Sequence, residues 1–117
     1  MADARRALGT AGEDVAAAWY VKQGYEVVAR NWRCREGELD LVVRSGRTYV
    51  FCEVKTRTTD RFGAPVEAIT RAKQQRLRRL AARWLESDAP RPAASIRFDV
   101  ASVAGASGEV EVLEGAF

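Results

Sequence analysis

Apolar and polar residues along the chain follow a helical periodicity in two segments. Residues 10–23 predict a helix in which Thr10 and Glu13 have the spacing of a capping box, and Gly24 stands where that helix should end. Residues 70–85 predict a second helix, because apolar residues recur there at intervals of three and four. Its apolar stripe consists of Leu77, Leu80, Ala81 and Trp84. Both helices therefore need another layer to cover their apolar sides.

Five further segments are rich in β-branched and aromatic residues and predict strands. They are residues 25–30, 38–44, 49–56, 96–103 and 110–113. Residues 31–37 and 58–65 are expected to be connections, and Ser45-Gly46-Arg47 predicts a hairpin turn. The order α-β-β-β-α-β-β predicts an α/β fold, with a mixed central sheet flanked by helices, in a single domain over residues 1–117.

The predicted hairpin carries acidic and basic side chains on one face. Residues two apart on a strand point the same way, so Glu53 and Lys55 share a face of the second strand and Glu38 and Asp40 share a face of the first. The sequence therefore predicts one patch on which three carboxylates and an ammonium group gather.

The turn decides how the two strands align. A two-residue loop at Ser45-Gly46 pairs Asp40 with Phe51, which places Asp40 diagonal to Glu53, within ~7–8 Å. The same register puts Glu38 directly across from Glu53. Like charges opposite one another are unfavourable in a purely structural sheet, and a bound cation would remove the conflict.

Such a patch suits the chemistry of a hard divalent cation. Mg²⁺ prefers one or two carboxylates together with waters and phosphate oxygens, and Lys55 could orient a water or neutralise charge on a phosphate. Two other interpretations stay open. A Glu-x-Lys pair on a strand is often a solvated ion pair, and Glu13 serves equally well as a capping-box residue.

Composition narrows the chemistry further. The 117-residue chain has no His, which excludes His-based triads and most transition-metal sites, and its two Cys, Cys34 and Cys52, form no Cys-x-x-Cys motif. Two Cys favour a reducing cytosol. The N-terminus lacks the apolar run of a signal peptide, and no segment approaches the ~18–20 apolar residues that span a bilayer. We therefore expect a cytoplasmic protein that makes no use of a membrane.

The positive charge is concentrated in the first part of the chain. Residues 1–86 hold 17 of the 19 Lys and Arg but only 11 of the 16 Asp and Glu, and a basic surface favours nucleic acid. The residues expected to meet phosphates are Arg33, Arg35, Arg57, Arg61, Lys73 and Arg76. For any single one of them, an ordinary solvated side chain is the alternative. Trp32 could stack on a base or anchor the core.

Several stretches resemble a known nuclease superfamily. Glu13, Glu38-Leu-Asp40-Leu and Phe51-Cys-Glu53-Val-Lys55-Thr-Arg57 resemble the PD-(D/E)xK nucleases in their Holliday-junction-resolvase-like branch. More narrowly, the chain is similar to the YraN-like bacterial family, an endonuclease-like family. The similarity covers Ala29 to Leu41, Arg61-Phe-Gly, Lys73-Gln, Arg97-Phe-Asp-Val and Gly115-Ala-Phe117. It thus extends over almost the whole chain, although Leu39 stands where the motif's name has Pro.

The resemblance implies a restriction-endonuclease-like fold and assigns roles to the site residues. Asp40 and Glu53 are implied to bind Mg²⁺ or Mn²⁺, Lys55 to assist the attacking water, and Glu13 to be an accessory acid. Glu38 has no settled role there. Related resolvases act as homodimers, which is one arrangement open to this chain.

The resulting hypothesis is a Mg²⁺-dependent endonuclease that acts on DNA, with branched or otherwise structured DNA among its expected substrates. A non-catalytic nucleic-acid-binding protein with the same fold is the main alternative. A protein–protein adaptor with a basic face is a third.

Overall fold

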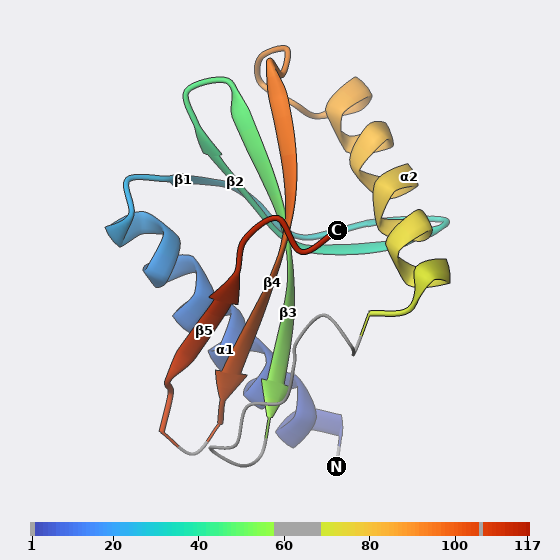
Figure 1. Ribbon diagram of the computed structural model, residues 1–117. Helices are drawn as coiled ribbons and strands as arrows, with labels where there is room; N and C mark the ends of the chain where they lie inside the picture. The colour runs from blue at the N-terminus through green and yellow to red at the C-terminus, as the bar shows by residue number, and fades with distance from the viewer. Residues whose placement is uncertain (1, 58–68, 106) are drawn as a thin grey trace.

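Five strands form one sheet in the order β1-β2-β3-β4-β5, in which β3 and β4 run parallel and all other neighbours antiparallel (Figure 1). The computed structural model describes residues 2–57, 69–105 and 107–117, and for residues 2–10 the backbone alone. The elements are α1 (Ala2–Lys22), β1 (Glu26–Cys34), β2 (Gly37–Ser45), β3 (Thr48–Arg57), α2 (Arg71–Ser87), β4 (Ser95–Ala104) and β5 (Val110–Leu113). The predicted α/β class, with a mixed sheet and two helices, is confirmed.

Helix α1 begins earlier than the sequence predicts. Its backbone is helical from Ala2, so the prediction that Thr10 caps the helix is wrong. The residues before Thr10 are rich in Ala, the best helix former, and they extend the helix in the N-terminal direction. The predicted end is confirmed: Gly24 has a φ of 94°, and the N–H of Tyr25 donates to the carbonyl of Tyr20 at 3.0 Å.

Strands β1 and β2 form a longer hairpin than expected. Residues 31–37 were expected to be a connection, but the pairing continues through Trp32–Leu39 and Arg33–Glu38 to Cys34–Gly37. Cross-strand pairing here overrides a locally polar sequence. An ion pair between Arg83 of α2 and Glu36 holds the tip of the hairpin against the helix.

The register of the β2–β3 hairpin differs from the prediction by two residues. Ser45 pairs with Thr48 and Arg44 with Tyr49, which leaves Gly46-Arg47 as the two-residue loop. Gly46 has a φ of 61°, the left-handed conformation that such a loop requires. A two-residue shift leaves each side chain of β3 on its predicted face, because the side-chain period is also two.

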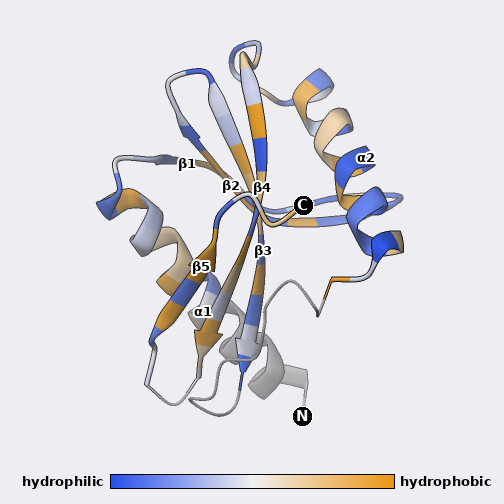
Figure 2. Cartoon of the chain, viewed as in Figure 1, coloured by the Kyte–Doolittle hydropathy of each residue, from blue (hydrophilic) through white to orange (hydrophobic). Residues whose placement is uncertain are grey.

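The two helices cover opposite faces of the sheet. The predicted α2 stripe is buried and packs against a cluster that includes Val42, Tyr49, Phe51 and Phe98. Helix α1 packs Ala16, Ala17 and Tyr20 against Leu41, Val43, Val50 and Cys52. Neighbouring residues on β2 and β3 thus alternate between the two clusters, as a sheet buried on both sides requires. Figure 2 shows both hydrophilic and hydrophobic residues along α2, as expected of a helix with one buried side.

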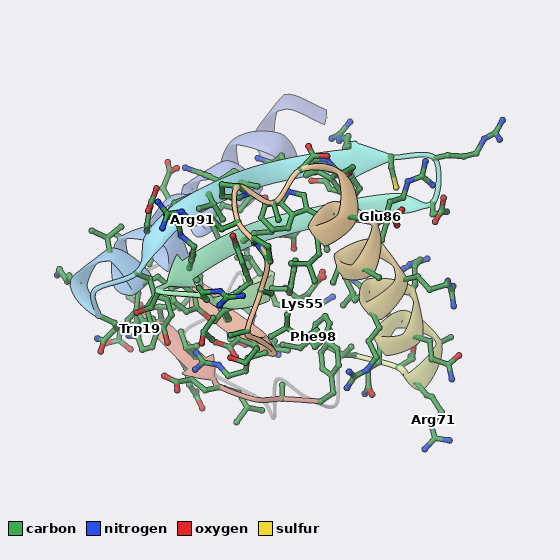
Figure 3. The ribbon with its side chains drawn as sticks, turned by 90° about the horizontal axis from the view of Figure 1, so that it is seen from above. Trp19, Lys55, Arg71, Glu86, Arg91 and Phe98 are labelled. Carbon is green, nitrogen blue, oxygen red and sulfur yellow. The ribbon has the colours of Figure 1, made fainter. Side chains whose placement is uncertain are left out.

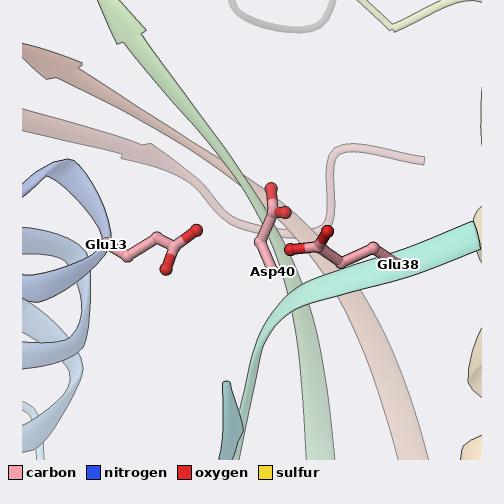
Figure 4. Close-up of side chains that lie close together, drawn as sticks. All are labelled: Glu13, Glu38 and Asp40. Atoms are coloured by element: carbon pink, nitrogen blue, oxygen red, sulfur yellow. The ribbon is translucent and has the colours of Figure 1, made fainter. Parts of the chain in front are cut away.

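The alternation breaks in β2 at Asp40. Leu39 belongs to the cluster under α2, whereas Leu41 belongs to the cluster under α1, although residues two apart should share a face. On the paired strand, Asn31 has a φ of 52°, and Figure 4 shows the ribbon of β2 bending beside Asp40. The predicted register is therefore wrong at this end of the hairpin: Glu38 pairs with Arg33 of β1 and does not lie across from Glu53.

A buried hydrogen-bond network ties α1 to β4 and to the C-terminal segment. Asp99 is fully buried and accepts hydrogen bonds from the hydroxyl of Tyr20 at 2.6 Å and from Gly115 N at 2.9 Å. Arg97 donates two more, at 2.8 and 2.9 Å. The carboxylate is therefore well satisfied, which is the condition for burying a charge without a large penalty.

Neither described helix is apolar enough over sufficient length to cross a bilayer.

We predict that Tyr20→Phe lowers the free energy of unfolding by about 1–3 kcal/mol, because it removes one donor from a buried carboxylate. Asp99→Asn should cost more, about 3–5 kcal/mol, because it removes the charge opposite Arg97. Urea denaturation monitored by circular dichroism measures both.

Glu111→Gln is the matched control, since Glu111 is exposed on β5, and it should change stability by less than about 0.5 kcal/mol. If Asp99→Asn is as stable as the control, the network has no structural role.

Candidate active site

Three carboxylates from α1 and β2 meet beside the bend in β2. Glu13, Glu38 and Asp40 each present an oxygen, and these oxygens lie within 4.8 Å of one another (Figure 4). All three side chains are half-buried. Carboxylate oxygens are the ligands that Mg²⁺ and Ca²⁺ prefer in proteins. The donor set therefore fits a hard divalent cation.

Local hydrogen bonds fix two of these carboxylates. The backbone N–H of Val54 on β3 donates to Oδ2 of Asp40 at 3.0 Å. The side-chain amide of Asn31 donates to Oε1 of Glu13 at 2.8 Å, and Arg30 lies 3.6 Å from the same oxygen. Glu13 thus faces the other two acids. It lies in the middle of α1, so it cannot cap the N-terminus of that helix.

Glu38 and Glu53 are each paired with a base. Arg33 donates to Oε2 of Glu38 at 3.1 Å, and Nζ of Lys73 lies 2.9 Å from Oε1 of Glu53. Glu38, Glu53 and Lys73 line a cavity of about 310 Å³ between the sheet and α2. Its lining residues are Gly37, Glu38, Asp40, Glu53, Lys73, Arg76 and Leu77.

The pKa of Asp40 is raised by its burial and by the neighbouring acids. Burial raises the pKa of Asp40 to about 7, and the charges of Glu53 and Glu13 add to that rise, while the hydrogen bond from Val54 opposes it. A carboxyl group with such a pKa is only partly ionised near neutral pH. A cation bound at this position would favour the ionised form.

Lys55 lies on the same face of β3 as Glu53, as predicted, between the sheet and α2 in the view of Figure 3. Partial burial lowers the pKa of Lys55, the nearby ammonium group of Lys73 lowers it further, and the charge of Glu53 opposes both effects. The structure therefore brings together Glu13, Asp40, Glu53 and Lys55, the four residues predicted to be catalytic, and adds Glu38 to them.

The predicted phosphate-binding residues divide into two groups. Arg35 is exposed at the β1–β2 turn, Arg33 is exposed but paired with Glu38, and Arg76 is exposed at the edge of the cavity. Lys73, by contrast, is engaged by Glu53 inside the cavity.

Arg57 lies at the end of β3, where its backbone carbonyl accepts a hydrogen bond from Gly105 N at 2.6 Å and its Nε is buried without a hydrogen-bond partner among the described residues. Arg61 and the predicted connection 58–65 lie outside the described residues. Trp32 packs against the cluster under α2, and its indole N–H donates to Asp88 at 3.2 Å. This placement favours the core role that the sequence left open.

The sequence did not predict the roles of two residues at the site. Asn31, which orients Glu13, was not assigned to the site, and Lys73, which was expected to meet phosphates, neutralises Glu53. One signal for Lys73 was available: it stands in the first turn of α2, where a helix prefers acidic residues and α2 has none. Asn31 carried no comparable signal, because its role depends on an unusual φ in β1.

We predict that Asp40→Asn stabilises the metal-free protein at alkaline pH. Because the pKa of Asp40 is higher in the folded state, the folded state binds more protons between about pH 4 and pH 7, and its stability falls as the pH rises through that range. At pH 8 the variant should be more stable by up to about 4 kcal/mol. The difference should largely disappear near pH 4.

Urea denaturation in EDTA at both pH values measures the effect. The Asn side chain keeps an oxygen that can accept the hydrogen bond from Val54, and Glu111→Gln is again the exposed control. A variant that is less stable than the wild type at pH 8 would contradict the inference that the ionised form of Asp40 destabilises the folded protein.

Comparison with known proteins places the chain in a family. The profile described as "Uncharacterised protein family UPF0102" matches residues 12–103. A UPF0102 protein of Frankia casuarinae is 52% identical over 117 residues, which cover 97% of this chain and 98% of the relative. A UPF0102 protein of Beutenbergia cavernae is 56% identical, with 96% of this chain and 97% of the relative covered. One from Nocardia farcinica is 51% identical over 111 residues, or 94% and 86%. This chain therefore belongs to the UPF0102 family.

Proposed function

We propose that this chain is a Mg²⁺- or Mn²⁺-dependent endonuclease that hydrolyses phosphodiester bonds in DNA, including branched or otherwise structured DNA. The observation that carries the proposal is the meeting of Glu13, Glu38 and Asp40 within 4.8 Å, at the edge of a cavity that Glu38, Asp40 and Glu53 line. An all-oxygen donor set beside a lysine is suited to phosphodiester hydrolysis.

We further propose that the α/β fold is restriction-endonuclease-like and that the family belongs to the PD-(D/E)xK superfamily. The support is the placement of the motif residues, with Asp40 on β2 and Glu53 and Lys55 on the neighbouring β3. The proposed setting is the cytoplasm. A homodimer is the assembly proposed for a substrate with two strands to cut.

The residues of this chain divide the work of such a reaction. When bound, a divalent cation polarises the phosphoryl group and lowers the pKa of a water molecule. Asp40, held by Val54 N–H, is placed to hold that cation together with Glu53 and the flanking acids Glu13 and Glu38. Lys55 neutralises charge that develops on the phosphate or orients the water.

Basic residues on α2 and on the β1–β2 hairpin would position the DNA. Arg76 borders the cavity on α2, and Arg33 and Arg35 stand on the β1–β2 hairpin. Contacts from such residues to phosphates give affinity without reading sequence. Such contacts favour a DNA substrate that is recognised by its shape and not by its base sequence.

A second candidate function is nucleic-acid binding without turnover. The observation in its favour is the ion pair between Lys73 and Glu53, which satisfies a motif acid without any metal ion. Salt-dependent DNA binding that survives Asp40→Ala, with no cleavage products, would favour this function.

We predict that Mg²⁺ or Mn²⁺ at millimolar concentration raises the melting temperature of the wild type at pH 8, because a ligand that binds only the folded state stabilises it. Asp40→Ala should abolish the increase, and EDTA should reverse it. Glu86→Ala, which removes an exposed acid of α2, is the matched control and should keep the full increase. An equal increase in all three proteins would mean that the cation binds elsewhere.

We also predict cleavage of one or more substrates in a panel of duplexes, flaps, four-way junctions and single strands. Asp40→Ala and Glu53→Ala should each reduce the rate by roughly 10³-fold or more, since a bound metal supplies several kcal/mol to the transition state. Glu86→Ala should cleave at the wild-type rate. Wild-type protein that binds Mn²⁺ but cleaves nothing in the panel would overturn the catalytic proposal.

A further inference from the structure

Lys73 is a base at an unfavourable position of its helix. It stands in the first turn of α2, where the helix dipole is positive and disfavours a base. Its own backbone N–H donates to the side chain of the N-cap residue Thr70 at 3.1 Å. The position is therefore well defined, but helix stability does not explain why a lysine occupies it.

The ion pair with Glu53 explains why a lysine occupies this position. Its Nζ lies 2.9 Å from Oε1 of Glu53, whose side chain is only 9% exposed, while that of Lys73 is 27% exposed. An ion pair so far removed from solvent is far less screened than a surface pair. Without a counter-ion, Glu53 would add a further nearly buried negative charge next to Asp40. Lys73 thus supplies, within the chain, the positive charge that the acidic site needs.

The cavity leaves room for the side chain of Lys73 to move away from Glu53. The cavity of about 310 Å³ that Glu53 and Lys73 share is also lined by Asp40, Glu38 and Arg76. A lysine has a flexible four-carbon stem and can turn its ammonium group to a new acceptor without moving the helix. Helix α2 itself is anchored by its buried stripe, so the exchange needs a side-chain movement alone.

We propose that Lys73 is the resident counter-ion of Glu53, that a divalent cation must displace it from this carboxylate, and that the released ammonium group then binds a phosphate of the nucleic acid. This inference rests on the proposed function, because it assumes that Glu53 is a cation ligand. Lys73 would thereby couple the two binding events: the cation frees the lysine, and the phosphate keeps it from returning.

The test is Mn²⁺ affinity, measured by calorimetry and by electron paramagnetic resonance at pH 8 without DNA. Lys73→Met removes the competitor, so it should bind Mn²⁺ about tenfold more tightly than the wild type, or more, as expected when a charge-assisted hydrogen bond no longer competes. Lys73→Arg keeps the charge and should not bind more tightly than the wild type. Arg79→Met is the matched control, because Arg79 is exposed on the same helix and does not line the cavity, and its Mn²⁺ affinity should stay within about twofold of the wild type.

The second half of the proposal is tested by DNA affinity. With Mn²⁺ present, Lys73→Met should bind a DNA duplex more weakly and with a shallower salt dependence than the wild type, by about one phosphate contact. With EDTA, the two proteins should differ less, because Lys73 is then held by Glu53. Melting temperatures establish that each variant is folded, and Lys73→Gln replaces Lys73→Met if the latter is not.

The outcomes separate this inference from the proposed function. Unchanged or weaker Mn²⁺ binding by Lys73→Met, with a wild type that binds Mn²⁺, overturns the counter-ion role alone. Tighter binding by Lys73→Met in a protein that cleaves no DNA supports the counter-ion role and overturns catalysis. Absence of Mn²⁺ binding in every variant overturns both.

Discussion

The hydrogen bond from Val54 N–H to Asp40 joins β3 to β2 at the point where β2 bends. Beyond Leu41–Cys52 the regular pairing of β2 with β3 stops, and the Asp40 side chain takes a backbone donor of β3. This substitution lets β2 change faces without leaving a buried N–H unsatisfied. The site, the hairpin of β1 and β2, and the cavity under α2 all depend on that bend.

The charged groups around the bend and their partners come from five different elements. Each acid has its own nearby base or donor: Glu13 has Asn31, Glu38 has Arg33, and Glu53 has Lys73. Asp40 has only a neutral backbone donor, and burial together with the charges of Glu53 and Glu13 raises its pKa despite that hydrogen bond. The destabilising contribution is therefore concentrated in one carboxyl group. Such concentration is typical of functional sites, where a group is held in a costly environment by a stable surrounding structure.

That surrounding structure comes from apolar burial on both faces of the sheet and from a polar network remote from the acidic residues. Asp99 is satisfied by Tyr20, Arg97 and Gly115, so it fixes α1 and the C-terminal segment on the sheet. The α2 stripe fixes the other helix. Because both helices are held independently of the site, Glu13 and Lys73 arrive at it in defined positions. The molecule can therefore tolerate the repulsion around Asp40 as long as these contacts hold.

The sequence by itself determined the α/β class, the α2 stripe and the face of β3 that carries Glu53 and Lys55, because all of these follow from local periodicity. It could not determine the β2–β3 register, since shifts of two residues leave the same side chains on the same face. Nor could it show that β2 bends at Asp40, because the bend depends on Asn31 and Val54, which belong to other strands. The sequence placed Glu38 beside Asp40, and the family resemblance implied Glu13 as an accessory acid. Only the tertiary structure decided how close the three carboxylates come and that Lys73 pairs with Glu53, because those contacts join elements distant in the chain.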